Sequence, residues 1–319
     1  MAQPTAPLDR RRLFALLSPA YLWLLVAVFL PLSAMLFFSF LTDLPHDAPG
    51  LGGTLGNYNQ FLMNPTYSTL LWKSLKLGFT VTLVCILIGY PCALVLARTI
   101  KGRVRETLFL LVILPFWPNS LVRIFSWAIV LRGNGVLERG LEFIMPFDIQ
   151  LNLMFTTEAV VIGLVHSFLP YVILTSYLAL QAIDDDIVDA ARSMSASRMT
   201  ILWRLLLPLS LPGLLAGAVL VFVPVVGSFM EPRILGGRMG TYFGTVIEDQ
   251  FVAVYNWPLG AALSFILLAV VLLVLALSSP ILKGPEHEGF RSFADRSLLA
   301  GADPRVPLRA DPCYGDDVL

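Results

Sequence analysis

The sequence predicts an all-α integral membrane protein with six membrane-spanning helices. Hydrophobic residues make up 57% of the 319 residues and charged residues only 14%, whereas a soluble domain has about 25% charged residues. The chain therefore has too few charges to cover a globular surface, and we expect lipid to surround most of it. Long stretches without charge are the second observation, since one spanning helix needs about 20 mostly apolar residues. The formal net charge of zero gives no reason to expect a nucleic-acid partner.

The charge-free stretches locate the spans in order along the chain. We expect crossings at residues 17–40, 75–97, 107–131, 159–183, 205–230 and 259–282. The first is not a cleaved signal, because its apolar run is too long and no small-residue cleavage site follows it. The spans form a transmembrane domain over residues 13–283, after a short cytosolic tail at residues 1–12. Residues 284–319 are polar and rich in Pro, Gly and Asp, and predict a disordered cytosolic tail.

Basic residues predict how the spans are oriented, because cytosolic loops of membrane proteins carry an excess of Lys and Arg. With the N terminus in the cytosol, 15 of the 22 Lys and Arg residues fall on the cytosolic side. Both ends of the chain are therefore predicted to be cytosolic. The loop that follows the fourth span, residues 184–204, then also lies in the cytosol.

This cytosolic loop has the pattern of two short helices separated by a turn. An Asp among residues 184–186 can cap the start of the first helix. Four residues then recur at helical spacing on one face: Ile187, Ala190, Ala191 and Met194. Residues 195–197 are a plausible break, and a second helix over residues 198–206 leads to Pro208. The pattern alone fits an ordinary connector as well as a surface on which another protein docks.

The loop resembles the Glu-Ala-Ala loop of the permease subunits of ABC importers. That family has Glu-Ala-Ala, three further residues, Gly, and later Leu-Pro, and this chain matches the spacing without a gap. Asp189 stands in place of the family's Glu, and Ser195 stands in place of its Gly. Asp keeps the carboxylate on a shorter arm, whereas Ser adopts a left-handed backbone less readily than Gly does. The resemblance assigns coupling to the ATPase to Asp189, Ala190, Ala191, Met194, Ser195, Leu207 and Pro208.

The resemblance covers roughly residues 13–282 and is closest to the permease subunits of polyamine (spermidine and putrescine) importers. Similar segments include Ile88-Gly89-Tyr90-Pro91, residues 114–119, Leu169-Pro170-Tyr171, Leu235-Gly236-Gly237 and residues 256–262. It implies a type I ABC-importer permease in the bacterial inner membrane. Related iron and sulfate permeases share several of these segments, so a permease for another small solute is the alternative.

The resemblance also implies the partners of an ATP-driven importer. Cytosolic ATPase subunits would use ATP and Mg²⁺, and a periplasmic or lipid-anchored protein would deliver the substrate. A second permease subunit, expected to be a distinct paralogue, would complete the pathway of which this chain forms half. The chain itself contains no Walker-type phosphate loop, and we expect it to bind no cofactor and to catalyse no reaction.

Ionisable residues at membrane depth are costly, and they therefore mark candidate positions on a substrate pathway. A polyamine is a polycation, so carboxylates and aromatic faces would suit its outer entrance. The candidates are Glu231, Asp249, Glu158, Trp117, Tyr171, Asn119 and Arg123. Each carboxylate and aromatic residue here could equally be an interface or packing residue, and Arg233 could simply neutralise Glu231.

Small residues and prolines in the fifth span suggest two further roles. Gly213 and Gly217 form a small-xxx-small pair, which we interpret as close helix packing. Pro224 and Gly227 lie nearer the outer end and are candidates for a gate.

Two other functional classes fit the sequence less well. A secondary carrier places ion-coordinating groups near the membrane midplane, but the second, fifth and sixth predicted spans contain no carboxylate. An intramembrane serine protease needs a Ser nucleophile close to a His. Ser228 lacks the flanking Gly of such a motif, and the fifth and sixth spans contain no His. The chain has only three His residues, with no metal-ligand spacing.

Overall fold

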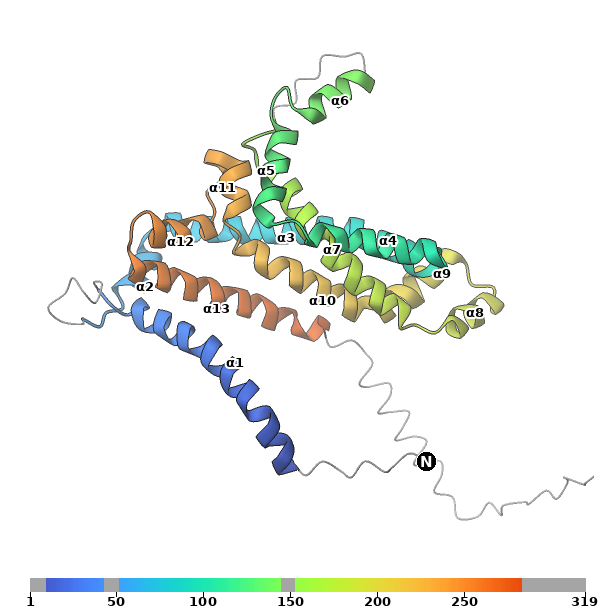
Figure 1. The fold of residues 1–319 in the computed structure, drawn as a ribbon, viewed down its shortest axis with the longest axis horizontal. Helices are drawn as coiled ribbons and strands as arrows, with labels where there is room; N and C mark the ends of the chain where they lie inside the picture. The colour runs from blue at the N-terminus through green and yellow to red at the C-terminus, as the bar shows by residue number, and fades with distance from the viewer. Residues whose placement is uncertain (1–9, 43–51, 145–152, 283–319) are drawn as a thin grey trace, which may run out of the picture. The chain divides into compact units, whose positions relative to one another are not determined.

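The computed structural model describes residues 10–42, 52–144 and 153–282, and the regular elements of these ranges are helices (Figure 1). Five of them are long and apolar enough to cross a membrane. They contain or form α1 (Arg10–Ser39), α3 (Pro65–Arg98), α7 (Thr157–Gln181), α10 (Leu207–Val226) and α13 (Trp257–Leu282). These helices correspond to five of the six predicted spans. The predicted tail at residues 284–319 and most of the tail at residues 1–12 lie outside the described residues.

Shorter helices connect the long ones. They are α2 (Gly56–Met63), α4 (Arg103–Ile113), η1 (Leu114–Phe116), α5 (Ser120–Leu131), α6 (Val136–Ile144), α8 (Asp185–Ser193), α9 (Arg198–Ile201), η2 (Leu202–Leu206), α11 (Met230–Gly236), η3 (Gly237–Gly240) and α12 (Phe243–Val252). The chain divides into two compact units at residues 277 and 278, and the packing described below belongs to the first unit.

The third predicted span is broken rather than straight. Helices α4 and α5 meet at an angle of 93°, although together they are apolar enough for one span. Pro115 and Pro118 lie in the break, where proline supplies no backbone N–H and disfavours helix in the preceding residue. Asn119 then starts α5, because its side-chain oxygen accepts a hydrogen bond from Leu121 N at 2.9 Å. The predicted crossing at residues 107–131 therefore corresponds to two helices that meet at a bend.

The fifth predicted span begins through a widened turn and ends early. Pro208 has no N–H with which to continue the α-helical bonding pattern. In the preceding turn, η2, the N–H of Leu207 donates to the carbonyl of Leu202, five residues back. Such a π turn lets the helix continue past the missing donor. Because α10 ends at Val226, Glu231 does not end the fifth span as expected, but lies in the separate helix α11.

Helices α3, α7 and α10 pack side by side and form the centre of the unit (Figure 1). Their buried apolar side chains include Leu77, Val81, Cys85, Val160, Leu164, Val172, Leu214, Val221 and Val225. A Cβ atom at Gly213 would collide with Ala179 and lie 2.8 Å from the carbonyl oxygen of Thr175. One at Gly217 would lie 3.1 Å from Cα of Val172. The interpretation of these two glycines as packing residues is confirmed.

Helix α1 has the surface of a segment surrounded by lipid or by another chain. Only 6% of its most apolar window is buried. Its exposed side chains include Tyr21, Leu22, Trp23, Phe29 and Leu30. Soluble monomers rarely expose apolar patches larger than a few hundred Å², so this surface agrees with the predicted membrane environment.

We expect the substitution Gly213→Ala to loosen the contact between α10 and α7. The added methyl group meets the backbone of α7, and such overpacking costs about 1–3 kcal/mol. The measurement is thermal unfolding of the purified protein in detergent. Gly140→Ala in α6 is the matched control, because a Cβ atom there meets nothing within 4 Å. Equal unfolding temperatures for the two variants would contradict this account of α7 and α10.

Candidate functional site

The predicted cytosolic loop is a helix–turn–helix, formed by α8, a tight turn and α9. Ser195 occupies the turn with a left-handed backbone, at a φ of 59°. This is the position at which the resembled family has Gly, and a side chain makes this conformation unfavourable by roughly 1–2 kcal/mol. Ser197 then caps α9, because its hydroxyl accepts a hydrogen bond from Thr200 N at 3.2 Å. Both short helices and the break between them are confirmed.

The start of α8 is held differently from the expectation. Asp184 stands at the N-cap position, but its side chain makes no capping hydrogen bond. Instead, the carboxylate of Asp185 accepts a hydrogen bond from Nη1 of Arg98 at 2.5 Å. Acidic residues in the first turn still suit the positive end of the helix dipole.

Arg98 joins three helices at this point. It is the last residue of α3, and its side chain is only 16% exposed. Its Nη2 donates to the carbonyl oxygens of Leu180 at 2.6 Å and Ile183 at 2.8 Å, at the end of α7. A cation there interacts favourably with the negative end of the α7 dipole. Sequence reasoning counted Arg98 only as a cytosolic charge, because nothing local identifies its carbonyl partners.

One face of α8 is anchored and the other is free. Val188 is 6% exposed and packs in a core cluster with Ile201 and Leu206. Of the predicted stripe, Ile187, Ala190 and Met194 are exposed and Ala191 is half-buried. Met194 reaches 83% exposure.

The other predicted coupling residues lie around this free face. Asp189 is exposed and forms an ion pair with Arg192 at 2.8 Å. Met199 and Trp203 in the following segment are also exposed. Leu207 and Pro208 are the first two residues of α10. The loop therefore presents an apolar surface, made by Ile187, Ala190, Met194, Met199 and Trp203, that we call the α8 surface.

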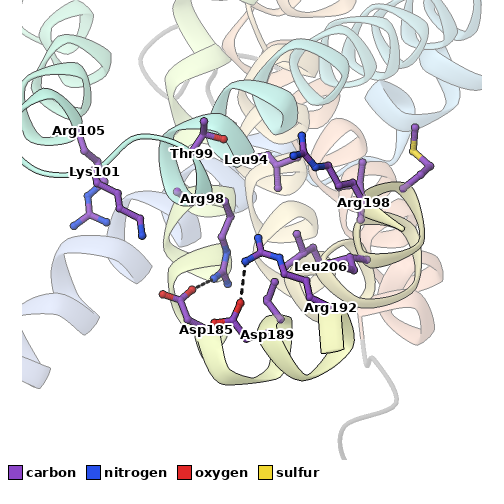
Figure 2. Close-up of a pocket in the computed structure, with 15 residues that line it drawn as sticks. Leu94, Arg98, Thr99, Lys101, Arg105, Asp185, Asp189, Arg192, Arg198 and Leu206 are labelled. Atoms are coloured by element: carbon purple, nitrogen blue, oxygen red, sulfur yellow. Dashed lines mark hydrogen bonds and ion pairs between the residues drawn. The ribbon is translucent and has the colours of Figure 1, made fainter. Parts of the chain in front are cut away.

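A cavity of about 930 Å³ lies beside α8 (Figure 2). Its lining comes from the end of α3, the turn into α4 and the start of α4, and from the segment α8–η2. These are the two loops that the basic residues assign to the cytosolic side. Their meeting at one cavity agrees with that orientation.

Glu231 is buried, at 9% exposure, in the short helix α11. Gly163 of α7 allows this helix to approach, since a Cβ atom there would collide with the side chain of Leu235. Arg233 does not neutralise Glu231. It pairs with Asp249 at 2.5 Å and with Glu248, which links α11 to α12.

Burial raises the pKa of Glu231 above its ordinary value. A hydrogen bond from its own backbone N–H and the positive charge of Arg123 oppose this rise without cancelling it. The structure thus brings Glu231 and Arg123, two of the predicted pathway residues, within electrostatic reach of each other. No ion pair involves Glu231 among the described residues.

Arg123 holds the break between α4 and α5. Its Nη1 donates to the carbonyl oxygen of Pro115 at 2.8 Å, across the bend. Beside it lies a cavity of about 410 Å³, which Trp127 and His166 also line. The rings of Trp127 and His166 meet edge to face at 5.5 Å. His166 Nδ1 is buried and has no hydrogen-bond partner among the described residues.

The remaining pathway candidates do not gather around Glu231. Tyr171 packs against Phe116, with ring centroids 4.8 Å apart. Trp117 is 87% exposed, and Glu158 is exposed in the first turn of α7. The side-chain oxygen of Asn119 is occupied by the α5 cap, and Asp249 by Arg233. Within the described ranges, no three His, Cys, Asp or Glu residues lie close enough to hold a metal ion.

Comparison with known proteins identifies a family and several relatives that this chain resembles. The model of the family described as "binding-protein-dependent transport system inner membrane component" matches residues 86–283. The spermidine/putrescine transport system permease protein PotB of Escherichia coli (strain K12) is 38% identical over 253 residues, covering 79% of this chain and 91% of that protein. PotB of Haemophilus influenzae is 36% identical over 255 residues, covering 79% and 88%.

A solved structure agrees at the level of the fold. A chain from a bacterial ABC transporter involved in the import of the acidic polysaccharide alginate superposes with a TM-score of 0.67. It is 15% identical, and the superposition covers 85% of this chain and 94% of that one. At this identity the match supports the all-helical architecture only.

We expect Glu231→Gln to raise the unfolding temperature at neutral pH. Because the pKa of Glu231 is raised in the folded protein, the folded state binds this proton more tightly than the unfolded chain does. Glu231 therefore lowers the free energy of unfolding as pH rises from the ordinary carboxyl pKa through the raised pKa of the folded protein. Gln removes this loss, so the two unfolding temperatures should converge as pH falls below that window.

The control for this experiment is Glu158→Gln, which changes an exposed carboxylate. It should shift the unfolding temperature little at any pH. A Glu231→Gln variant that is less stable than the parent at neutral pH would contradict the assignment of Glu231 as a buried, poorly solvated carboxylate.

Proposed function

The chain belongs to the family of binding-protein-dependent transport system inner membrane components, and from this premise we propose that it imports polyamines such as spermidine and putrescine. It is a multi-pass permease subunit of an ATP-driven ABC importer in a bacterial inner membrane, and it is not itself an enzyme. The assignment of polyamines as the cargo rests on the 38% identity to PotB over 79% of this chain.

The importer works with ATPase and substrate-binding protein partners. We assign ATP and Mg²⁺ to the cytosolic ATPase subunits and no cofactor to this chain. A second permease subunit, which we take to be a paralogue, supplies the other half of the pathway. The exposed apolar surface of α1 offers area that such a neighbour or lipid would cover.

The α8 surface supports docking of an ATPase subunit. Apolar side chains exposed on a cytosolic helix–turn–helix gain free energy when a partner covers them. Ala190 lies within this surface, and its small side chain allows a partner backbone to come close. Movement of α8 reaches the spans through Arg98, which binds α8 at Asp185 and α7 at Leu180 and Ile183. Rigid movement of α3 and α7 would then open the pathway alternately to the two sides.

Glu231 is the residue that we place on the pathway of a cation. Its carboxylate is buried beside the broken third span and forms no ion pair among the described residues. A passing ammonium group could therefore compensate a charge that the protein leaves unpaired. Arg123 limits how long a cation stays, because its positive charge acts on the same carboxylate.

The uptake of labelled spermidine and putrescine into membrane vesicles tests the proposal. The vesicles contain this chain with its ATPase, second permease and binding protein. We expect uptake that requires both ATP and the binding protein. If polyamines are not taken up although the ATPase subunits co-purify in stoichiometric amounts, the cargo assignment is wrong and another small solute must be sought.

We expect Ala190→Arg to reduce ATP-dependent uptake by roughly 30-fold or more, since a buried interface residue can contribute 2 kcal/mol or above. The long cationic side chain would hold the ATPase subunit away from the α8 surface. Membrane insertion and expression should stay at the parent level, because residue 190 is exposed. Ala190→Ser is the matched control and should transport nearly as well as the parent. Parent-level uptake by a well-expressed Ala190→Arg variant would refute docking at this surface.

A further inference from the structure

The cavity of about 930 Å³ beside α8 carries an excess of positive charge (Figure 2). Five cationic side chains line it: Arg98, Lys101, Arg105, Arg192 and Arg198. Two carboxylates, Asp185 and Asp189, also line it, and each is already paired with one of these arginines. The lining therefore holds three more cations than carboxylates.

The three remaining cations have no anionic partner in the described part of the chain. Lys101, Arg105 and Arg198 take part in none of its ion pairs. They come from two sides of the cavity, since Lys101 and Arg105 lie around the start of α4 and Arg198 starts α9. An anion that enters the cavity would meet these cations without competition from a carboxylate of the described residues.

The rest of the lining is apolar apart from Thr99. Leu94 and Ala97 belong to the last turns of α3, and Leu202 and Leu206 belong to the π turn that leads into α10. Both segments are the cytosolic ends of spanning helices, where the apolar core of a bilayer gives way to its headgroups. The cavity thus combines cationic side chains with an apolar wall at the predicted cytosolic ends of the spans.

We propose that this cavity binds the phosphate headgroup of an anionic phospholipid of the cytosolic leaflet. Arginine guanidinium groups match phosphate oxygens in geometry and charge, and basic pockets between spans on the cytosolic side suit such headgroups. The phosphate lies between Lys101, Arg105 and Arg198, and the upper part of an acyl chain lies along the apolar wall. An acidic side chain of a partner protein would satisfy the cations but would leave the apolar wall uncovered.

The bound headgroup would stiffen the connection between α8 and the spans. It bridges the α3–α4 turn to α9, which flanks the helix that we expect to meet the ATPase. Its effect adds to the direct link that Arg98 makes to Asp185. The inference goes beyond the proposed function, because lipid binding at this cavity does not depend on which solute is carried.

The test is a titration of phosphatidylglycerol into the purified complex of this chain with its partner subunits, read by native mass spectrometry. Each cation near a membrane surface contributes about 1 kcal/mol to the binding of anionic lipid, so each single substitution should weaken retention about fivefold. The variant Lys101→Gln/Arg105→Gln/Arg198→Gln should weaken it roughly 100-fold, as expected from three such contributions. Phosphatidylcholine should show no difference between the variants.

The matched control is Arg103→Gln/Arg132→Gln/Arg139→Gln, which removes the same charge from exposed residues that do not line the cavity. It should retain phosphatidylglycerol as the parent does. A charge-preserving variant, Lys101→Arg/Arg105→Lys/Arg198→Lys, should keep most of the binding and thus separates lost charge from lost folding. Equal retention by the neutralised variant and the control would overturn the proposal.

Two further arms identify the source of the anion. Inorganic phosphate should displace the lipid poorly, because it cannot cover the apolar wall. Displacement by phosphate at low millimolar concentration would show that the site takes a free anion, against the proposal. Loss of the ATPase subunit from the neutralised variant, with lipid retention unchanged, would assign the cations to an acidic partner surface instead.

Discussion

The requirement that backbone N–H and C=O groups stay hydrogen-bonded in lipid governs this structure. No water is available in the bilayer core, so a crossing segment must satisfy its own backbone. The long helices meet this requirement with their own backbone hydrogen bonds. Where a helix breaks, a side chain or a widened turn replaces the missing backbone bond. At the break in the third span, Asn119 bonds the N–H of Leu121, and Arg123 bonds the carbonyl of Pro115. At the start of α10, a π turn takes over where Pro208 supplies no donor. Each departure from a straight helix therefore has a named replacement.

Arg98 applies the same rule at the cytosolic boundary, with a consequence for coupling. The carbonyl groups of Leu180, in the last turn of α7, and of Ile183, just after this helix, both accept hydrogen bonds from Arg98 of α3. The same guanidinium binds Asp185 at the start of α8. One side chain of α3 therefore bonds both the end of α7 and the start of α8. This geometry gives the cytosolic helix a direct mechanical link to the membrane core, whereas the exposed Asp189–Arg192 pair links α8 only to itself.

The two membrane sides differ in how their charges are used. On the outer side, Arg233 is engaged by Glu248 and Asp249, which fixes α12 to α11 and leaves Glu231 unpaired. On the cytosolic side, two carboxylates are paired and three cations are not. An unpaired buried carboxylate suits a mobile cation that must leave again. Unpaired cations around a half-apolar cavity suit an anion that stays. The unpaired charge of Glu231 is costly because the residue is buried, whereas Lys101 and Arg198 are exposed and remain accessible to an anion.

The sequence by itself predicted where the apolar segments lie, the cytosolic helix–turn–helix and the turn that contains Ser195, because length, periodicity and turn chemistry are local properties. It also identified Gly213 and Gly217 as packing residues, since their spacing places both on one helix face. Only the tertiary structure decided that Arg233 pairs with Asp249, that Arg98 binds α7 and α8, and that the third span bends by 93°. These partners lie from 16 to 87 residues apart in the chain. Periodicity cannot report such contacts, because they depend on which helices pack together and at what angle.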